Sequence, residues 1–352
     1  MSEEIAKPKI GISVGDLNGI GMEVIIKTLS NPDIMELCTP IVYASSKVAS
    51  YHRKAINMED FSFHVINSMD QLHDKKANLF QCWKEDVNLE FGKESAEVGA
   101  FALKSLEKTC EAIENGEVEA MVTAPIHKKT IQSEAFQFSG HTDYLEARFK
   151  AKAIMMMVSD EMRMALATVH IPLSKVTDMV TEDLVHERIK TLHQSLKNDF
   201  VIPKPRIAVL ALNPHAGDSG VMGNEDETIV SKAISKAFDS GSMAFGPYPA
   251  DSFFGSGEYR KFDGILAMYH DQGLIPFKSL SFGRGVNYSA GLPFIRTSPD
   301  HGTAFGIAGQ GVADEGSFRE ALLLAADLVK KRAMSKELNQ DPLKIHKSDK
   351  ER

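Results

Sequence analysis

Three histidines in this 352-residue chain stand just past continuous apolar runs, one to three residues after each run ends. They are His170, His215 and His270, and the runs are 164–169, 207–212 and 264–268. A continuous apolar run is typical of a strand buried on both faces, and ligands of open α/β sheets gather beyond the carboxyl ends of strands. We therefore expect the imidazoles to converge. Three protein ligands with an open position are typical of a catalytic cation such as zinc, so a metal site is predicted.

Two aspartates are candidates for supporting roles at such a site. Asp271 directly follows His270, and Asp251 ends the proline-rich stretch 246–251. A carboxylate near a metal can orient a ligand imidazole through a hydrogen bond, or accept a proton during catalysis. Either aspartate could instead only cap a turn, and the sequence leaves that choice open.

A group of cations follows the last histidine of the three. Lys278, Arg284 and Arg296 lie beside Asn287 in loops rich in glycine. Cations together with an amide near a metal favour a substrate that carries a phosphate or a carboxylate. The alternative is a solvated positive surface, which the apolar and glycine neighbours of these residues make less favourable.

Two glycine-containing turns precede predicted helices. In the tetrad 140–143, His141 and Thr142 can offer imidazole, hydroxyl and backbone N–H groups to an anion, but Thr142 or Asp143 could equally be an N-cap. The turn at 15–23 follows an apolar strand, yet its spacing differs from G-x-G-x-x-G. A tight βα turn is therefore favoured there over a nucleotide-binding fingerprint.

The elements that must hold these residues alternate between strands and helices, which indicates an α/β fold. Further strands are predicted at 10–14, 41–44, 61–66 and 120–123, and 153–158 is a strand or a buried helix. Apolar residues at helical spacing predict helices at 95–116, 184–196 and 320–331. Residues 75–92 have mixed polarity and receive no assignment, and the charged tail 335–352 is expected to be loosely ordered.

Composition narrows the class of protein. A chain of this length can form two domains, and its net charge of −8 without a basic block gives no support for nucleic acid or an anionic membrane as a partner. Cys38, Cys82 and Cys110 are widely spaced, which fits a reducing compartment. Neither a signal-peptide core nor a run long enough to span a membrane is apparent, so a cytoplasmic protein is expected.

At this point the chain resembles a known family, the 4-hydroxythreonine-4-phosphate dehydrogenases. The resemblance covers nearly the whole sequence in order, apart from 75–92 and the charged tail. It rests on seven motifs: Gly140-His-Thr-Asp143, Ala165-Leu-Ala-Thr-Val-His-Ile-Pro172, Leu212-Asn-Pro-His-Ala-Gly217, Pro249-Ala-Asp251, Ala267-Met-Tyr-His-Asp-Gln-Gly273, Phe282-Gly-Arg-Gly-Val-Asn287 and Gly291-Leu-Pro-Phe-Ile-Arg-Thr-Ser298.

The resemblance implies a fold and a set of site residues. The fold would be two αβα domains, similar to isocitrate and isopropylmalate dehydrogenases, in a homodimer whose active site lies in the interdomain cleft at the subunit interface. The first domain would comprise 1–130 plus 305–352 and the second 131–304. Metal ligands would be His170, His215 and His270, and substrate contacts His141, Thr142, Lys278, Asn287 and Arg296.

A cofactor loop is also implied, because the stretch 300–314 is similar to the adenosine-binding loop of those dehydrogenases. His301, Gly302, Thr303 and Gly309 would contact NAD or NADP, whereas Phe305 and Gly306 depart from the usual pattern. Among metals, three imidazoles favour zinc by ligand softness, and magnesium and cobalt stay open.

The reaction implied is oxidation of 4-phosphohydroxy-L-threonine to 2-amino-3-oxo-4-phosphooxybutanoate, followed by decarboxylation to 3-amino-2-oxopropyl phosphate in vitamin B6 biosynthesis. Asp251, Asp271 and Lys278 are the candidate catalytic residues. The nearest alternative is a paralogue acting on 4-phospho-D-threonate, 4-phospho-erythronate or an aromatic cis-dihydrodiol. A phosphate acyltransferase and a non-catalytic binding protein are more distant alternatives.

Overall fold

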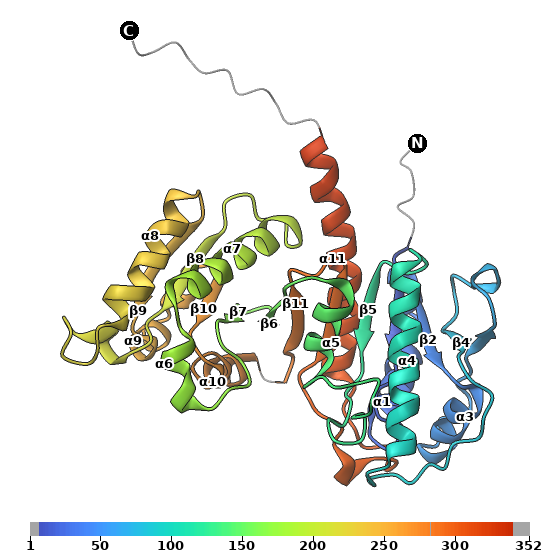
Figure 1. Ribbon diagram of the computed structural model, residues 1–352. Coiled ribbons are helices and arrows are strands. Elements are labelled where there is room, and N and C mark those ends of the chain that lie inside the picture. Colours follow the sequence, from blue (N-terminus) through green and yellow to red (C-terminus); the bar gives the residue numbers. More distant parts are fainter. Residues whose placement is uncertain (1–6, 282, 341–352) are drawn as a thin grey trace.

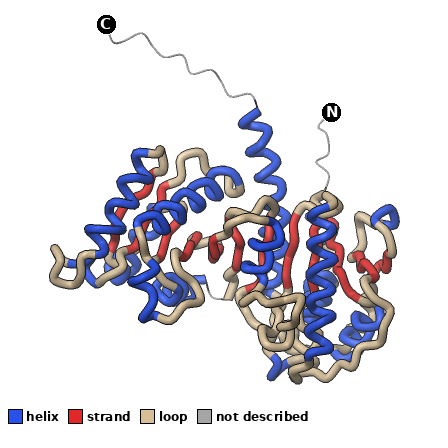
Figure 2. The backbone as a smooth tube through the Cα atoms, in the orientation of Figure 1, coloured by secondary structure: helices blue, strands red, loops and turns tan. Residues whose placement is uncertain are grey.

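One long sheet crosses the molecule and carries helices on both faces (Figures 1 and 2). The computed structural model describes residues 7–281 and 283–340, and in these residues the sheet has 12 strands in the order β3-β4-β2-β1-β5-β12-β11-β6-β7-β10-β8-β9. The predicted α/β class is confirmed. The strands are β1 (Lys9–Ser13), β2 (Thr39–Ala44), β3 (His64–Ile66), β4 (Asn78–Gln81), β5 (Ala120–Thr123), β6 (Ile154–Val158), β7 (Arg163–Leu166), β8 (Arg206–Leu210), β9 (Met243–Tyr248), β10 (Gly264–Ala267), β11 (Val286–Ala290) and β12 (Ile295–Pro299).

The sheet consists of two parallel blocks joined by an antiparallel centre. Within one block, β1 to β5 and β12 pair parallel with one another, and within the other block β7, β10, β8 and β9 do the same. Between the blocks, β12, β11, β6 and β7 pair antiparallel in that order. The two predicted domains meet within this sheet, since β12 pairs directly with β5, and their boundaries stay a prediction.

Helices cover the two faces in two sets (Figure 1). The helices α1, α7, α8 and α11 share one apolar core along one face of the sheet. On the opposite face, α4 and α5 contribute Leu106 and Leu145 to a second apolar cluster, and α9 and α10 contribute Phe253 and Phe277 to a third. Their bounds, with those of the shorter helices, are α1 (Gly21–Leu29), α2 (Ile34–Leu37), α3 (Ser46–Ala55), α4 (Ala96–Glu114), α5 (His141–Phe149), α6 (Val176–Met179), α7 (Glu182–Asn198), α8 (Ser231–Asp239), α9 (Ala250–Gly255), α10 (His270–Ser281) and α11 (Gly316–Gln340).

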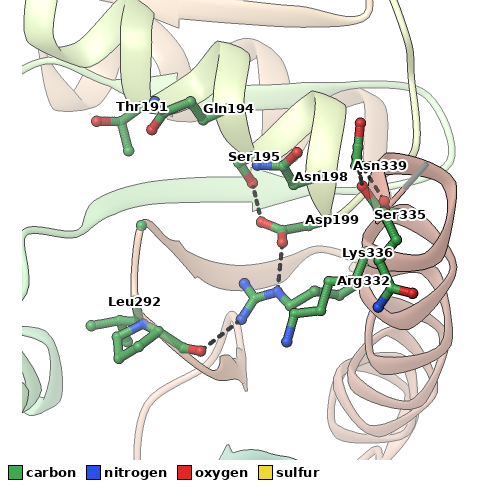
Figure 3. A pocket seen from close by; sticks show the side chains of 13 residues that line it. Thr191, Gln194, Ser195, Asn198, Asp199, Leu292, Arg332, Ser335, Lys336 and Asn339 are labelled. Atoms are coloured by element: carbon green, nitrogen blue, oxygen red, sulfur yellow. Dashed lines mark hydrogen bonds and ion pairs between the residues drawn. The ribbon is translucent and has the colours of Figure 1, made fainter. Parts of the chain in front are cut away.

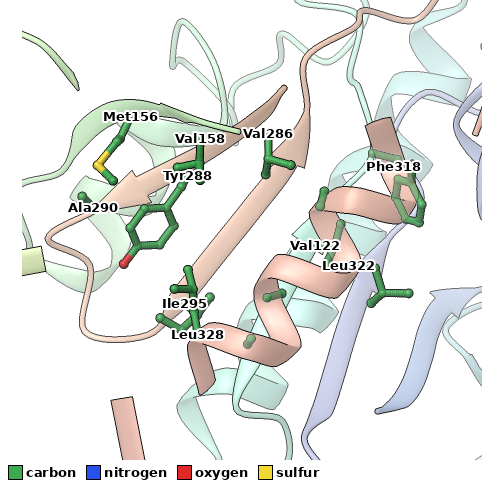
Figure 4. Packing of buried hydrophobic residues seen from close by; sticks show 14 of the residues in the cluster. Val122, Met156, Val158, Val286, Tyr288, Ala290, Ile295, Phe318, Leu322 and Leu328 are labelled. Atoms are coloured by element: carbon green, nitrogen blue, oxygen red, sulfur yellow. The ribbon is translucent and has the colours of Figure 1, made fainter. Parts of the chain in front are cut away.

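The packing of α11 fixes which side chains of the central strands face each way (Figure 4). Phe318, Leu322 and Leu328 of α11 share one apolar core with Tyr288 of β11 and Ile295 of β12. Successive side chains of a strand point to opposite faces, so the residues between these core positions point away from α11. Asn287 and Ser289 of β11 and Arg296 of β12 therefore lie on the face that carries α4 and α5, whereas Thr297 faces α11.

Two expectations about the end of the chain need correction. Helix α11 begins four residues before and ends nine residues after the predicted helix 320–331, because its apolar positions continue to meet the sheet and α7. The tail was expected to be loosely ordered from Ser335, but Ser335 is buried and its carbonyl accepts a hydrogen bond of 2.6 Å from Asn339 Nδ2. The rest of the predicted tail, 341–352, lies outside the described residues.

Most predicted strands are confirmed, including 10–14, 41–44 and 120–123, and 153–158 is a strand rather than a helix. The unassigned stretch 75–92 contains β4, which the sequence pattern did not reveal. None of the helices among the described residues is long and apolar enough to cross a membrane. All three cysteines are free.

Candidate functional site

The ends of β7, β10 and β8 are tied together by polar side chains. Thr168 Oγ1 donates a hydrogen bond of 2.7 Å to the carbonyl of Met268, which links the segments after β7 and β10. Gln272 accepts a bond of 2.7 Å from the Met268 amide and donates one of 2.6 Å to the carbonyl of Ala211, which follows β8. These bonds satisfy backbone groups where the ladder stops, and they hold the strand ends in register.

Two of the three predicted metal ligands lie together at these ends. The rings of His170 and His270 are 5.8 Å apart between centroids, and both line a cavity of about 410 Å³. Asp271 Oδ1 lies 2.8 Å from His270 Nδ1, which fixes the ring and leaves Nε2 toward a ligand. Burial, then the charge of Lys128 and of His270, lowers the pKa of His170, which favours the neutral imidazole that binds metals.

The residues after β10 form a helix, which the sequence analysis did not predict. His270 opens this helix, α10, and Gly273 lies in its first turn. A Cβ atom at Gly273 would approach Leu166 Cδ2 to 2.6 Å and Ala267 Cβ to 3.1 Å. The glycine therefore permits the close approach of α10 to β7 and β10 that brings His270 to the strand ends.

The third predicted ligand, His215, does not join the other two. It lies exposed in the loop after β8, and its φ of 53° and that of Ala216, 54°, are left-handed values that non-glycine residues adopt at a cost. The buried carboxylate of Asp226 holds this loop by accepting hydrogen bonds from the amides of Leu212 and Asn213, at 2.7 and 2.9 Å. Across residues 7–281 and 283–340, no group of three or more histidine, cysteine or acidic side chains could hold a metal ion.

The two candidate acids differ in position. Asp271 contacts His270 and so has the geometry of an orienting group, although its own side chain is 73% exposed. Asp251 lies exposed on α9, and the linings of the two described cavities that contain His170 do not include it. The structure thus brings Asp271, and not Asp251, to the histidines.

A second cavity, of about 250 Å³, adjoins His170 and contains the buried cation of the site. Arg296 is 3% exposed and points from β12 into this cavity, which Asn287 and Thr123 also line. Its guanidinium donates to Thr123 Oγ1 from Nε and Nη2, at 3.2 and 2.7 Å, and to Ser289 Oγ from Nη1 at 3.1 Å. Among the described residues no carboxylate pairs with Arg296, and burial lowers the pKa of its guanidinium.

Unpaired polar atoms surround this cation. His141 Nε2 and Asn287 Oδ1 are buried without a hydrogen-bond partner in the described part of the chain, and both residues line the cavity. Burial, and then the charge of Arg296, lowers the pKa of His141 well below its ordinary value. A buried polar atom without a partner costs free energy, so these atoms and Arg296 together favour a polar, anionic occupant.

The tetrad 140–143 does not cap a helix in the way that the sequence suggested. Gly140 occupies the N-cap of α5 and makes no side-chain cap. His141, Thr142 and Asp143 form the first turn of that helix, so neither Thr142 nor Asp143 is the N-cap. All four residues line the Arg296 cavity, where the amides of the first turn add to its positive potential.

The predicted group of cations is divided by the fold. Only Arg296 lies in the cavity with Asn287. Lys278 is exposed on α10 and forms an ion pair of 3.2 Å with Asp300, whose pKa is raised by burial although Lys278 opposes that rise. Arg284 lines a separate cavity with Glu320.

The predicted cofactor loop borders the same cavity. His301 and Gly302 line it, whereas the carbonyl of Thr303 accepts a hydrogen bond of 3.0 Å from the amide of Ile20. Backbone of the chain itself therefore contacts the turn after β1, which agrees with a tight βα turn rather than a nucleotide-binding turn. Gly309 has a φ of 74° and packs against Phe91, where a Cβ atom would come within 2.4 Å of the ring.

The largest described cavity, of about 620 Å³, lies elsewhere, between α7, α11 and the turn that joins β11 to β12 (Figure 3). Asp199 is buried there and accepts hydrogen bonds from Arg332 Nε at 2.7 Å, Tyr288 Oη at 2.6 Å and Ser195 Oγ at 2.8 Å. Both oxygens of this carboxylate thus accept hydrogen bonds within the protein. Its polar groups need no ligand, in contrast to those around Arg296.

Sequence reasoning missed Thr123 and Ser289, the two hydroxyls that hold Arg296. Thr123 is the last residue of β5, so its position at a strand end was a usable signal. No comparable signal marks Ser289, because its contact with Arg296 arises from the pairing of β11 with β12.

The fold and the cavity define an α/β protein with a buried arginine in a cavity beside two histidines at strand ends. Residues 36–325 match the model of a family described as pyridoxal phosphate biosynthetic protein PdxA, and the chain belongs to this family. The 4-hydroxythreonine-4-phosphate dehydrogenase of Bacteroides thetaiotaomicron is 48% identical over 96% of this chain and 93% of its own length. That of Prosthecochloris aestuarii is 38% identical over 92% and 97%. The predicted resemblance to a dehydrogenase family is confirmed.

Solved structures agree with this assignment. The 4-hydroxythreonine-4-phosphate dehydrogenase of Klebsiella pneumoniae superposes with a TM-score of 0.80 at 30% identity, covering 93% of this chain and 99% of that one. A terephthalate 1,2-cis-dihydrodiol dehydrogenase of Burkholderia xenovorans has a TM-score of 0.62 at 22% identity, over 92% and 98% of the two chains, and shares the fold.

Proposed function

We propose that this chain oxidises 4-phosphohydroxy-L-threonine with NAD or NADP as hydride acceptor. The product, 2-amino-3-oxo-4-phosphooxybutanoate, would lose carbon dioxide to give 3-amino-2-oxopropyl phosphate. The observation that carries the substrate class is Arg296, a buried cation without a carboxylate partner among the described residues, in a chain of the PdxA family.

Different residues of the cavity would bind different groups of the substrate. Arg296 would bind an anionic group of the substrate, because its burial removes competing water and strengthens the charge–charge attraction. His141, Thr142 and Asn287 would complete the contacts with polar atoms that have room for a ligand. Lys278 is placed for a second anionic group only if it leaves Asp300, with which it pairs at 3.2 Å.

The imidazole nitrogens at the strand ends are of a type that binds divalent metals. His170 and His270 would hold it, with Asp271 orienting His270 through the contact at 2.8 Å. A metal bound there supplies a Lewis acid that makes the substrate hydroxyl easier to deprotonate. We favour zinc on ligand softness, with magnesium and cobalt as alternatives. The proton acceptor would be Asp271, which lies at the histidines, before Asp251.

We further propose a homodimer, with the site at the subunit interface. His215 would reach a three-histidine site from a second copy, because within one chain it lies apart from His170 and His270. Leu173 lines the cavity of this pair and Ile275 lies on α10, and their side chains are 71% and 65% exposed. The same contact would cover both. His301, Gly302, Thr303 and Gly309 are proposed for the cofactor, and the reduced cysteines suit the cytoplasm.

The test is formation of NADH or NADPH from 4-phosphohydroxy-L-threonine, with and without a chelator, in the native protein and in His215→Ala. We expect chelator-sensitive reduction that the variant lacks. His186→Ala, on α7 and outside the linings of both cavities that contain His170, is the matched control and should behave as the native protein.

Other outcomes would redirect the proposal. Parallel assays with 4-phospho-D-threonate, 4-phospho-D-erythronate and an aromatic cis-dihydrodiol test the alternative substrates. If the metal-replete, folded protein reduces the nicotinamide only with one of these, the substrate assignment is wrong. Reduction that is indifferent to chelator and to His215→Ala would remove the metal from the mechanism and keep the dehydrogenase.

A further inference from the structure

The sheet register places two hydroxyls at the guanidinium of Arg296. On one side, Arg296 is level with Met121 of β5 and Thr297 with Val122, so Thr123 follows on the same face as Arg296. On the other side, Tyr288 is level with Thr297, so Ser289 lies beside Arg296 on that face. The cation is therefore flanked by one hydroxyl from each neighbouring strand.

These hydroxyls occupy three of the five N–H directions of the guanidinium. Thr123 Oγ1 accepts from Nε and Nη2, and Ser289 Oγ accepts from Nη1. Both hydroxyl residues are buried, 0% and 1% exposed. Because a guanidinium has five N–H donors in a rigid plane, three such bonds fix its orientation and leave two donors for a ligand.

The choice of hydroxyls matters because they are neutral. A carboxylate at either position would form an ion pair with Arg296 and neutralise the charge that a substrate anion needs. A hydroxyl satisfies the same N–H groups without cancelling the charge. While it accepts from Arg296, each hydroxyl also keeps its own hydrogen to donate, and Thr123 lines the cavity.

We infer that Thr123 and Ser289 are positioning residues of the substrate site, which hold Arg296 in place as an unneutralised cation for a phosphate or carboxylate group. This inference rests on the proposed function, and it adds that anion affinity depends on hydroxyl groups from two strands. Thr123 has the larger role, because it accepts two of the three bonds and borders the cavity.

The experiment compares Thr123→Val, which replaces the hydroxyl by a methyl group, with Thr123→Ser, which keeps it. KM and kcat for the phosphorylated substrate are measured, together with the affinity for inorganic phosphate by calorimetry and the melting temperature. Thr297→Val is the matched control. This buried threonine lies on the other face of β12, and its hydroxyl donates a hydrogen bond of 2.8 Å to the carbonyl of Ala321.

For Thr123→Val we expect the KM and the phosphate dissociation constant to rise about tenfold to hundredfold, the cost of hydrogen bonds to a charged group, with kcat changed by less than about threefold. Thr123→Ser should restore both constants. Ser289→Ala should raise them by about tenfold or less, and Thr297→Val should leave them unchanged.

Two results would overturn the inference. One is unchanged phosphate affinity and KM in Thr123→Val, and the other is an equal rise in Thr297→Val, which would indicate a general loss of packing. Calorimetry with phosphate needs no nicotinamide, so it separates this inference from the proposed reaction. Phosphate binding that depends on Thr123 in a protein that oxidises nothing would uphold the positioning role and reject the reaction.

Discussion

Two arginines lie on opposite faces of the strand pair β11 and β12, and their partners differ. Arg296 is buried and Arg332 is half-buried. Arg332 donates to one carboxylate oxygen of Asp199 at 2.7 Å, and Tyr288 and Ser195 donate to the other (Figure 3). Arg296 meets only hydroxyls. The Arg332 cluster carries no net charge, and both oxygens of its carboxylate are bonded. The Arg296 cluster keeps its positive charge, and two of its N–H donors have no partner among the described residues.

The difference separates a structural polar cluster from the proposed substrate site. Removing one partner from a buried ion pair is costly because the other charge is left alone, so the Arg332 cluster should govern stability. The Arg296 site already carries an unpaired charge, so it should cost stability and supply affinity. Cavity size alone would favour the Arg332 cluster as the binding site, since the larger of the two cavities adjoins Arg332. Unsatisfied polar groups are the better guide to function here.

The largest effect is expected for Asp199→Asn. This change leaves Arg332 without its carboxylate, so the free energy of unfolding should fall by about 3 kcal/mol or more. Urea unfolding measures it, with Asp239→Asn at the exposed end of α8 as the control. The folded fraction should retain the native KM. A loss of substrate affinity without a loss of stability would break the proposed distinction.

Arg296→Met should show the reverse. Removing an unpaired buried cation should leave the free energy of unfolding equal or higher, while kcat/KM falls by at least about a hundredfold, or roughly 3 kcal/mol. Arg332→Met serves as the matched variant, and it should lose stability instead. If Arg296→Met unfolds as readily as Arg332→Met, the two clusters do not differ in the way described.

A third buried group, the imidazole of His52, contacts no carboxylate among the described residues and lines none of the described cavities, so it shows the effect of burial without a charged partner. Burial lowers the pKa of His52 to about 4, against 6.5 for a free imidazole, and its Nε2 has no partner in the described residues. Between these values the unfolded chain binds the proton more tightly, so stability falls as pH drops from about 6.5 to about 4 and then levels off.

His52→Phe should remove this pH dependence. The native protein should lose about 3 kcal/mol more than the variant across that range, a figure that follows from the shift in pKa. Urea unfolding at several pH values measures the difference. Parallel curves for the two proteins would show that His52 is not held neutral by burial.

The smallest effects come from a matched pair of hydroxyls. Ser195→Ala removes one of three bonds to Asp199 and should lower the free energy of unfolding by about 1 kcal/mol, with no change in KM. Ser289→Ala should change KM and leave stability within about 0.5 kcal/mol. Unfolding curves and kinetics on both variants decide the matter, and equal effects on both quantities would contradict the comparison.

The sequence predicted the pieces of the site better than their assembly. His170 and His270 follow apolar strands, and the expectation that they meet is correct because β7 and β10 are neighbours. His215 also follows a strand next to β10, yet its loop turns away through left-handed residues. A strand end fixes where a loop starts, whereas the loop conformation decides where the side chain goes.

By itself the sequence determined most of the strands, the long helices and the family, because periodic burial and long motifs are local properties of the chain. Only the tertiary structure decided which of the three cations is buried in the cavity. Lys278, Arg284 and Arg296 are alike as residues, but pairing with β5 and β11 buries Arg296 among hydroxyls, while Lys278 meets Asp300. The residue type alone sets the charge that a side chain can carry. Its desolvation and its partners depend on segments that lie far apart in the sequence.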